Sequence, residues 1–149
     1  MHAFTSTQAQ RGFTLIELMV TVSIAGILSS VALPSFENVL HKARRTDALV
    51  ASMQVQAAQE RFRSNAASYG TLADIRVPAR SAAGHYTLEV AANTADSYEL
   101  LATATGAQSR DAACRHMKLT STGMNLVHAS GADATLANPA AANSKCWSL

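Results

Sequence analysis

The sequence predicts an α+β protein in which one long N-terminal α-helix packs against a small antiparallel β-sheet. Three observations support this fold class: an apolar run over residues 13–33, a helical pattern that continues to about residue 63, and strand patterns that begin only after residue 84. A helix followed by successive strands is the order of an α+β chain, whereas alternating strands and helices would predict a parallel sheet. With 149 residues, the chain has room for one head domain of ordinary size after the apolar run.

The first helical segment, residues 13–34, is long and apolar enough to cross a bilayer. Phe13–Leu33 contains 21 residues with Glu17 as its only charge. At about 1.5 Å rise per residue it extends about 30 Å, the thickness of a membrane's hydrocarbon core. A buried helix of a soluble domain is the alternative, but a domain this small has no interior of that length. A carboxylate in such a segment costs about 2.5–3.5 kcal/mol on insertion scales, so Glu17 is a candidate functional residue.

The helical pattern continues past Pro34 as an amphipathic segment over residues 35–63. A proline inside a helix removes a backbone hydrogen bond, so we expect a kink or a local opening at Pro34. Ala48–Glu60 consists of strong helix formers, and Ser64-Asn65 ends the pattern. The stripe that defines the helical period comprises Phe36, Val39, Leu40, Ala43, Asp47, Val50, Gln54 and Ala57.

The remaining residues, 64–149, predict a globular head. We expect a connecting loop over Ala66–Gly84, and an irregular segment over Gly131–Lys145 because it is rich in Ala, Asn and Pro. Short turns between the strand patterns favour an antiparallel meander that packs one face on the second half of the helix. The strand patterns are Tyr86–Val90, Tyr98–Thr105, His116–Thr120 and Met124–His128, with turns at Asn93–Asp96 and Ser121–Gly123.

The N-terminal motif resembles the class III signal of the type IV pilin and pseudopilin family. Arg11 and Gly12 precede the sequence FTLIEL at residues 13–18, and the apolar helix follows. The resemblance is close over Arg11–Pro34 and weaker over the head, where SKCW at residues 144–147 is similar to the C-terminus of some short pilins. It implies the pilin fold, with residues 1–12 as the prepilin leader peptide and residues 13–34 as the transmembrane and assembly helix. Residues 35–63 would continue this helix, and residues 64–149 would form the β-sheet head.

The resemblance implies cleavage between Gly12 and Phe13 by a prepilin peptidase, which then methylates the new amine of Phe13. A glycine before the cut suits a protease cleft, because its backbone adopts conformations that other residues avoid. An ordinary secretory signal cut after Ser30-Val31-Ala32 is the alternative. Glu17 inside the apolar core argues against that alternative.

The resemblance also assigns Glu17 to assembly. In the pilin family the matching carboxylate pairs with the N-terminal amine of a neighbouring subunit. Two opposite charges in a medium of low dielectric constant favour such a pair, because each charge otherwise lacks solvation. The pairing would set the axial register of a growing filament. A glutamate that snorkels to the membrane surface without a partner is the alternative.

Export, which the resemblance implies, would expose Cys114 and Cys146 to an oxidising compartment, where a disulfide is expected. Closing a loop of about 31 residues stabilises the fold by about 3–4 kcal/mol in the chain-entropy model. In pilins this C-terminal region varies and often carries surface recognition. Two free buried thiols are the alternative. Because no Cys or His has zinc-finger spacing, we expect no metal and no cofactor.

The charge distribution gives no bulk signal for nucleic-acid binding by the head. The net charge is +2, and it becomes +1 without residues 1–12, which carry Arg11. The basic excess lies on the helix, where Lys42–Arg45 is either a solvated face or a contact for anionic lipid or DNA. Beyond residue 64 the basic residues Arg76, Arg80, Arg110, Arg115, Lys118 and Lys145 balance the acidic residues Asp74, Glu89, Asp96, Glu99, Asp111 and Asp133.

No motif indicates an enzyme. The sequence contains no nucleophile elbow and no arrangement that predicts a catalytic triad. Only 5% of the residues are aromatic, which suits a long helix with a small head better than a large packed enzyme. The candidate metal or acid–base residues His41, His85, His116 and His128 lack ligand spacing, so we expect them to be surface or half-buried residues.

The resemblance therefore implies a structural subunit of a type IV pilus, either a major or a minor pilin. We expect a single-pass protein of the bacterial inner membrane that later joins an extracellular fibre of the kind used for adhesion and twitching motility. The expected partners are other pilin subunits, the prepilin peptidase and the inner-membrane assembly machinery. A type II secretion pseudopilin is one alternative, which the cysteine pair and the lack of an acidic calcium-type loop disfavour. A DNA-uptake minor pilin is the other, and the head charge does not support it.

Overall fold

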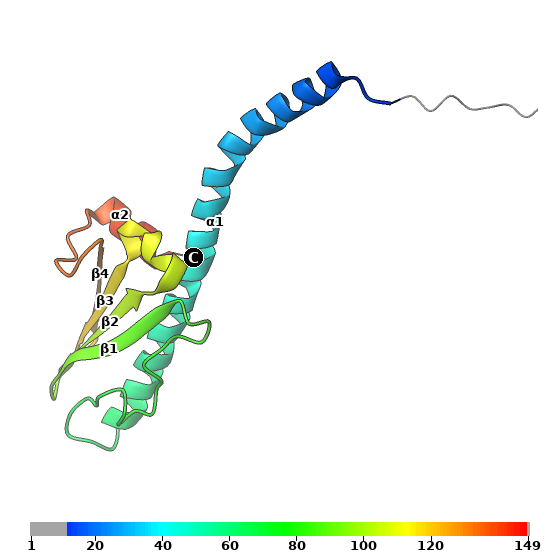
Figure 1. Cartoon of the computed structure of the whole chain (residues 1–149). Coiled ribbons are helices and arrows are strands. Elements are labelled where there is room, and N and C mark those ends of the chain that lie inside the picture. The colour runs from blue at the N-terminus through cyan, green and yellow to red at the C-terminus, as the bar shows by residue number, and fades with distance from the viewer. Residues whose placement is uncertain (1–11, 149) are drawn as a thin grey trace, which may run out of the picture. The chain divides into compact units, whose positions relative to one another are not determined.

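The computed structural model describes residues 12–148, with side chains for all of these except 33–35. One compact unit reaches Glu37, the other begins at Asn38, and helix α1 (Leu15–Arg63) runs through both. The predicted fold class is confirmed, since a long N-terminal helix precedes a four-stranded antiparallel sheet (Figure 1). The other elements are β1 (Tyr86–Asn93), β2 (Ser97–Ala104), η1 (Gly106–Arg110), η2 (Ala112–Cys114), β3 (His116–Thr122), β4 (Asn125–Gly131) and α2 (Ala140–Trp147).

Helix α1 has 49 residues, and its sequence changes character along its length. In the first unit every side chain from Phe13 to Ala32 is exposed, and the most apolar window of the helix has a mean hydropathy of 2.0. By length and composition this helix could cross a membrane. In the second unit a stripe of mostly small or apolar residues, with the polar Gln59 at its end, is buried at helical spacing, namely Ala48, Leu49, Ala51, Ser52, Val55, Ala58 and Gln59.

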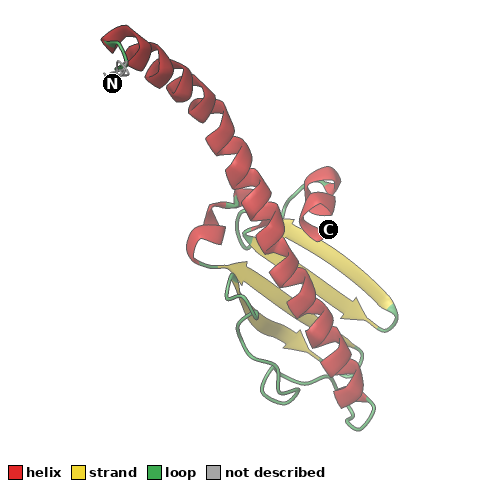
Figure 2. Cartoon of the chain, turned by 90° about the vertical axis from the view of Figure 1, so that its right-hand side faces the viewer, coloured by secondary structure: helices red, strands yellow, loops and turns green. Residues whose placement is uncertain are grey.

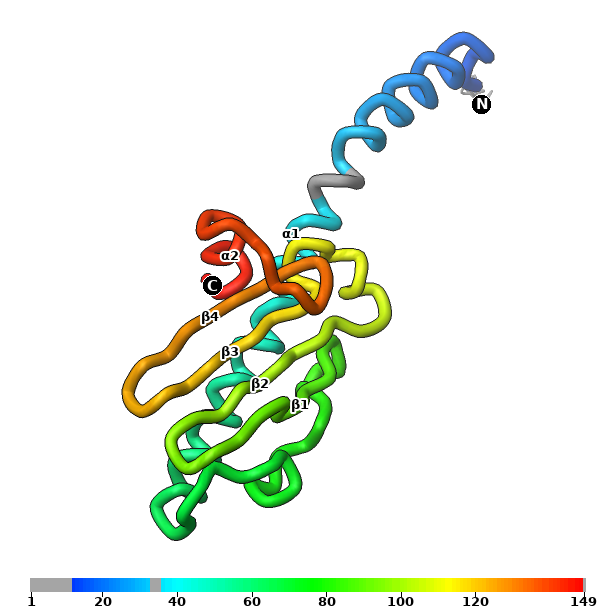
Figure 3. The backbone as a smooth tube through the Cα atoms, turned by 90° about the vertical axis from the view of Figure 1, so that its left-hand side faces the viewer, coloured from blue at the N-terminus to red at the C-terminus, as the bar shows by residue number. Residues whose placement is uncertain are grey.

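The four strands form a meander in the order β1-β2-β3-β4, with every neighbouring pair antiparallel (Figure 3). The β3–β4 turn contains Gly123 at φ +56°, a left-handed conformation that favours glycine. A bulge in β1 between Val90 and Ala92 shifts the register of its end. The strand and turn positions expected from the alternating patterns therefore agree with the observed hairpins.

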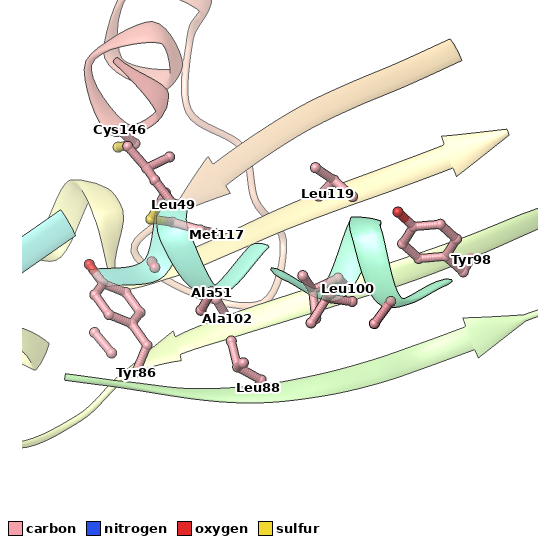
Figure 4. Packing of buried hydrophobic residues seen from close by; sticks show 14 of the residues in the cluster. Leu49, Ala51, Tyr86, Leu88, Tyr98, Leu100, Ala102, Met117, Leu119 and Cys146 are labelled. Atoms are coloured by element: carbon pink, nitrogen blue, oxygen red, sulfur yellow. The ribbon is translucent and has the colours of Figure 1, made fainter. Parts of the chain in front are cut away.

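One face of the sheet packs against the second half of α1, which crosses it (Figure 2). Alternate residues of the central strands point to the helix, so that Tyr98, Leu100 and Ala102 of β2 are buried. Met117 and Leu119 of β3 extend this layer, as the close view of the core shows (Figure 4). Ala48, Ala51 and Ala58 on the helix keep the two layers close, because their side chains are small.

The C-terminal segment departs from the prediction. Gly131–Lys145 was expected to be irregular, but α2 occupies Ala140–Trp147. Pro139 lies at the position before the first helical residue, where a proline is compatible with a helix start. The alanines that follow are strong helix formers, and the disulfide and the contacts of Trp147 hold this short helix on the head.

Candidate assembly site

The first turn of α1 contains the carboxylate that the sequence assigns to assembly. Thr14 directly precedes the helix, and Glu17 lies in its first turn. The backbone N–H and the hydroxyl of Thr14 both donate hydrogen bonds to Oε2 of Glu17, each at 2.8 Å. The N–H of Glu17 donates in return to the Thr14 hydroxyl at 3.3 Å. This reciprocal arrangement is a capping box, which satisfies backbone donors that would otherwise lack partners at the helix start.

Thr14 is a functional candidate that the sequence analysis missed. The signal for it is the Thr-x-x-Glu spacing directly before an apolar run, which is the sequence pattern of a capping box. The structure thus gives Glu17 a partner within its own chain, in addition to the partner that assembly would supply.

The expected processing site lies just before this capping box. Gly12 and Phe13 precede the helix and are both exposed, Phe13 to 87%. Residues 1–11 of the predicted leader lie outside the described residues, so the cleavage and the methylation of Phe13 stay predictions. Helix α1 continues across Pro34, and the kink expected there also stays a prediction.

Cys114 and Cys146 form the predicted disulfide. Both residues are fully buried, and the alternative of two free thiols is wrong. The bond joins η2 to α2. The indole N–H of Trp147 donates to the Ala129 carbonyl at 3.2 Å, and the Asn143 amide donates to the His128 carbonyl at 2.8 Å. The disulfide and these bonds together hold the C-terminal segment against strand β4.

Arg45 belongs to a buried polar network and not to the basic surface predicted over Lys42–Arg45. Its guanidinium donates to both carboxylate oxygens of Asp111, at 2.6 and 2.9 Å, and the two side chains keep only 17% and 6% of their exposure. The prediction of one basic face was therefore wrong for this residue. Arg45 lies three residues before the buried Ala48, so the helical period turns it toward the head.

Gln108 of η1 connects this ion pair to the core. Its amide nitrogen donates to Asp111 at 3.0 Å and to the Tyr86 hydroxyl at 3.2 Å. Burial raises the pKa of Tyr86 to about 12, so its hydroxyl keeps its proton and donates to the Cys114 carbonyl. The network therefore links α1, η1 and the disulfide through satisfied hydrogen bonds.

A surface pocket of about 580 Å³ lies beside the C-terminal end of α1 and includes two arginines. Arg61 and Arg76 line it together with Asn65 and the apolar Phe62. Within residues 12–148 neither guanidinium forms an ion pair. Asp74 also lines the pocket, and hydrogen bonds from Thr71 lower the pKa of its carboxyl. The pocket is thus lined by two cationic side chains and one carboxylate, and this positive balance favours an anion such as a phosphate.

His41 of α1 and His128 of β4 each contact a side chain of the head. Nδ1 of His41 forms a hydrogen bond of 3.1 Å with Oε1, the side-chain amide oxygen of Gln108. The ring of His128 lies 4.4 Å from that of Trp147. In the described part of the chain, no group of three or more His, Cys, Asp or Glu side chains is arranged to hold a metal ion.

Two family models match the chain, and they cover its two parts. The model described as "Prokaryotic N-terminal methylation motif" matches residues 7–33, which include the capping box and the apolar helix. The model described as "Type IV minor pilin ComP, DNA uptake sequence receptor" matches residues 34–118, from the second part of α1 to the middle of β3. The second match alone covers more than half of the chain.

Curated relatives are similar mainly in the N-terminal part. Prepilin peptidase-dependent protein D of Escherichia coli (strain K12) is 58% identical over 40 residues, 27% of each chain. Type IV major pilin protein PilE1 of Neisseria gonorrhoeae is 33% identical over 84 residues, 54% of this chain and 51% of the relative. Fimbrial protein Q of Moraxella bovis is 50% identical over 38 residues, 26% of this chain and 24% of the relative. The matches thus span about half of PilE1 and about a quarter of the other two relatives.

The resemblance to type IV pilins, first drawn from residues 11–34, is confirmed by these matches and extends into the head. The helix-and-meander fold, the disulfide and the capped apolar helix agree with it. The chain belongs to the family of the type IV minor pilin ComP.

Proposed function

We propose that this chain is a minor structural subunit of a type IV pilus, processed between Gly12 and Phe13 and assembled through α1. The observation that carries the proposal is the capped carboxylate of Glu17 at the start of an exposed apolar helix, inside the match to the N-terminal methylation motif. An apolar helix with no cover needs either lipid or other helices around it. A pilin uses lipid before assembly and neighbouring subunits afterwards.

The proposal names partners and a location. Residues 1–12 would be the leader that the prepilin peptidase removes, and residues 13–34 would hold the chain in the inner membrane. The pilus assembly machinery would then transfer the subunit into a fibre, where other pilins surround α1. The head from residue 64 onward would remain on the fibre surface and have no enzymatic role.

Mass spectrometry and fibre shearing test this proposal. A subunit purified from membranes and from sheared fibres should begin at N-methylated Phe13 in both fractions. An intact leader, or a terminus near Leu33, would contradict the processing step. Recovery from membranes alone, with a secretion defect in the deletion strain, would favour a type II secretion pseudopilin instead.

A second candidate function is that of a DNA receptor within the fibre. The match to the ComP model favours it, and the Arg61–Arg76 pocket supplies a site for a backbone phosphate that the overall charge of the head does not reveal. The two guanidiniums come from the end of α1 and from the loop before β1, so folding brings together charges that lie 15 residues apart in the sequence.

Anisotropy of a labelled DNA duplex with the detergent-solubilised full chain tests this candidate. Binding should weaken as the salt concentration rises, and Arg61→Ala or Arg76→Ala should reduce the slope of log affinity against log salt by about 1 each. Arg110→Ala removes an exposed arginine outside the pocket and is the matched control. Equal affinities for the pocket variants and the wild type would remove the pocket from consideration.

A further inference from the structure

The sheet has two edge strands, and they are protected differently. β1 forms one edge, and it carries the charge of Glu89 and a bulge between Val90 and Ala92. The loop before β1 also lies along this strand, since the N–H of Leu88 donates to the Ala79 carbonyl at 2.8 Å. A charge, a bulge and a covering loop each keep an edge strand from pairing with another chain.

Strand β4 forms the other edge (Figure 3), and its own sequence supplies none of these devices. Residues 119–132, which include all of β4, contain no Asp, Glu, Lys, Arg or Pro. Its register with β3 continues without a bulge. Leu126 and Val127 are 47% and 53% exposed, so apolar side chains lie along this strand. An uncharged, apolar strand without proline pairs readily with a strand of another chain.

The C-terminal segment, residues 132–148, covers the second half of this edge. The N–H of Asn138 donates to the Ser130 carbonyl at 3.1 Å, and the side-chain amide of Asn143 donates to the His128 carbonyl at 2.8 Å. Ser130 is fully buried, whereas the first half of β4 is exposed. The segment therefore shortens the open edge, because two carbonyls that another strand would use already have partners.

Two features hold the segment in place, and they lie at different points along it. At Gly131 the backbone of Leu136 is so close that an added Cβ would lie 2.8 Å from the Leu136 Cα. The glycine thus lets the segment lie directly on the strand. Further along, the disulfide between Cys146 and Cys114 joins the segment to η2. Each of these two features can be removed by substitution without changing the other.

We infer that the C-terminal segment is a cover for the edge of β4, and that the uncovered edge binds the same edge of a second copy of this chain. The backbone groups that Asn138 and Asn143 now occupy would bond to the second chain, in an antiparallel pair related by a twofold axis. The strand suits its own copy because it is uncharged, and like charges opposite each other would destabilise the pair. The inference concerns the head alone and does not depend on the pilus proposal.

Two variants remove the cover in different ways. Gly131→Ala places a methyl group against the segment and keeps the disulfide. Cys114→Ser combined with Cys146→Ser removes the bond and leaves no thiol in the chain. In each variant, an added Val127→Lys puts a charge on the edge strand, which should block pairing without restoring the cover. Ala92→Lys puts the same charge at an exposed position of β1 and is the matched control.

The measurement is the mass of the full chain in detergent, by light scattering after size exclusion, at equal concentrations of all variants. Hydrogen exchange of residues 132–148 reports whether the segment is released. We expect faster exchange in both cover variants and a mass about twice that of the wild type, as for a twofold dimer. With Val127→Lys the mass should return to that of the wild type while exchange stays fast. With Ala92→Lys the mass should stay doubled.

A released segment in chains that keep the wild-type mass would overturn the inference. A segment that stays protected in both cover variants would overturn it as well, because it would then not be a removable cover. Suppression of the dimer by both lysines, or by neither, would assign association to a general loss of stability or to another surface, and not to β4. Suppression by Val127→Lys alone supports the inference.

Discussion

At the scale of single residues, the chemistry of Glu17 is set by what surrounds it. It lies in a segment whose side chains are all exposed and apolar or small, and the head core begins only at Ala48. The head therefore does not depend on this carboxylate for its stability. We expect its loss to affect assembly and to leave the folded head intact.

Glu17→Val should give a processed, membrane-resident subunit that enters fibres poorly. The substitution removes the insertion penalty of the charge but leaves a neighbour's amine without its partner, so the fibre-to-membrane ratio should fall at least about tenfold. Quantitative immunoblotting of sheared fibres and membranes measures this ratio. Ile16→Val, a small apolar change in the same turn, is the control. Wild-type incorporation of Glu17→Val would show that the carboxylate has no role in assembly.

Arg45→Ala should destabilise the head strongly. Asp111 would be left as a buried carboxylate without its ion pair, a loss of about 3–5 kcal/mol in free energy of unfolding. Denaturant unfolding of the full chain in detergent, followed by Trp147 fluorescence, measures it. Arg44→Ala removes the neighbouring arginine, which has no ion pair in residues 12–148, and should change stability by less than about 0.5 kcal/mol. If Arg45→Ala lost as little unfolding free energy as Arg44→Ala, the stabilising role of the Arg45–Asp111 ion pair would be refuted.

The contrast between Arg44 and Arg45 shows what residue-level sequence reasoning lacks. Both are arginines in one basic run, and composition alone treats them alike. Only the rotation of the helix relative to the sheet decides that one of them pairs with Asp111, which is 66 residues away in the sequence. Thr14, by contrast, interacts with a residue three positions away, so its capping role was predictable from local spacing.

At the scale of elements, local patterns were sufficient for most of the fold. The long helix and the four strands follow from residue periodicity and turn residues, and these features depend on near neighbours in the chain. α2 was missed because its eight residues are too few to form a stable helix alone. Tertiary contacts, chiefly the disulfide and the indole of Trp147, stabilise it.

Cys146→Ser should release α2 and lower the free energy of unfolding by about 3–4 kcal/mol, because the unfolded chain regains the freedom that the loop closure removed. Limited proteolysis should then cut within residues 131–148 faster than it does in the wild type. Ser144→Ala changes an exposed position of the same helix and serves as the control. Unchanged protection and stability in Cys146→Ser would mean that the noncovalent contacts of α2 are sufficient.

Mild acid should weaken the docking of α2 through His128. His128 is an exposed residue, but its ring lies 4.4 Å from that of Trp147, and the partial desolvation lowers the pKa of the imidazole. The unfolded chain therefore takes up this proton at a higher pH than the folded one. The stabilisation is therefore complete above about pH 6.5 and decreases as the pH falls below that value. Unfolding midpoints measured at several pH values by Trp147 fluorescence should fall as the pH falls below this value. In His128→Gln the midpoint should depend less on pH. If its dependence on pH were unchanged, groups other than His128 would be responsible.

At the scale of the whole molecule, the chain combines an apolar helical part with a head of balanced charge. Alkaline carbonate and high salt should leave it in the membrane pellet, and detergent should release it, because burial of apolar surface and not charge holds it there. A variant that starts at Asn38 behind a cleavable secretory signal should appear in the soluble periplasmic fraction. Release of the full chain by salt alone would contradict membrane anchoring through α1.

The order of the strands has a consequence for the rate at which the head folds. Each strand pairs only with its neighbours in the sequence. The outer hairpins β1–β2 and β3–β4 close turns of three and two residues, whereas 11 residues, 105–115, connect β2 to β3. Short loops lose little entropy on closing, and chains dominated by such local contacts fold quickly. We therefore expect the two outer hairpins to form before the pairing of β2 with β3 joins them into one sheet. Early closure of these hairpins would shorten the time during which unpaired strand edges could join those of another chain.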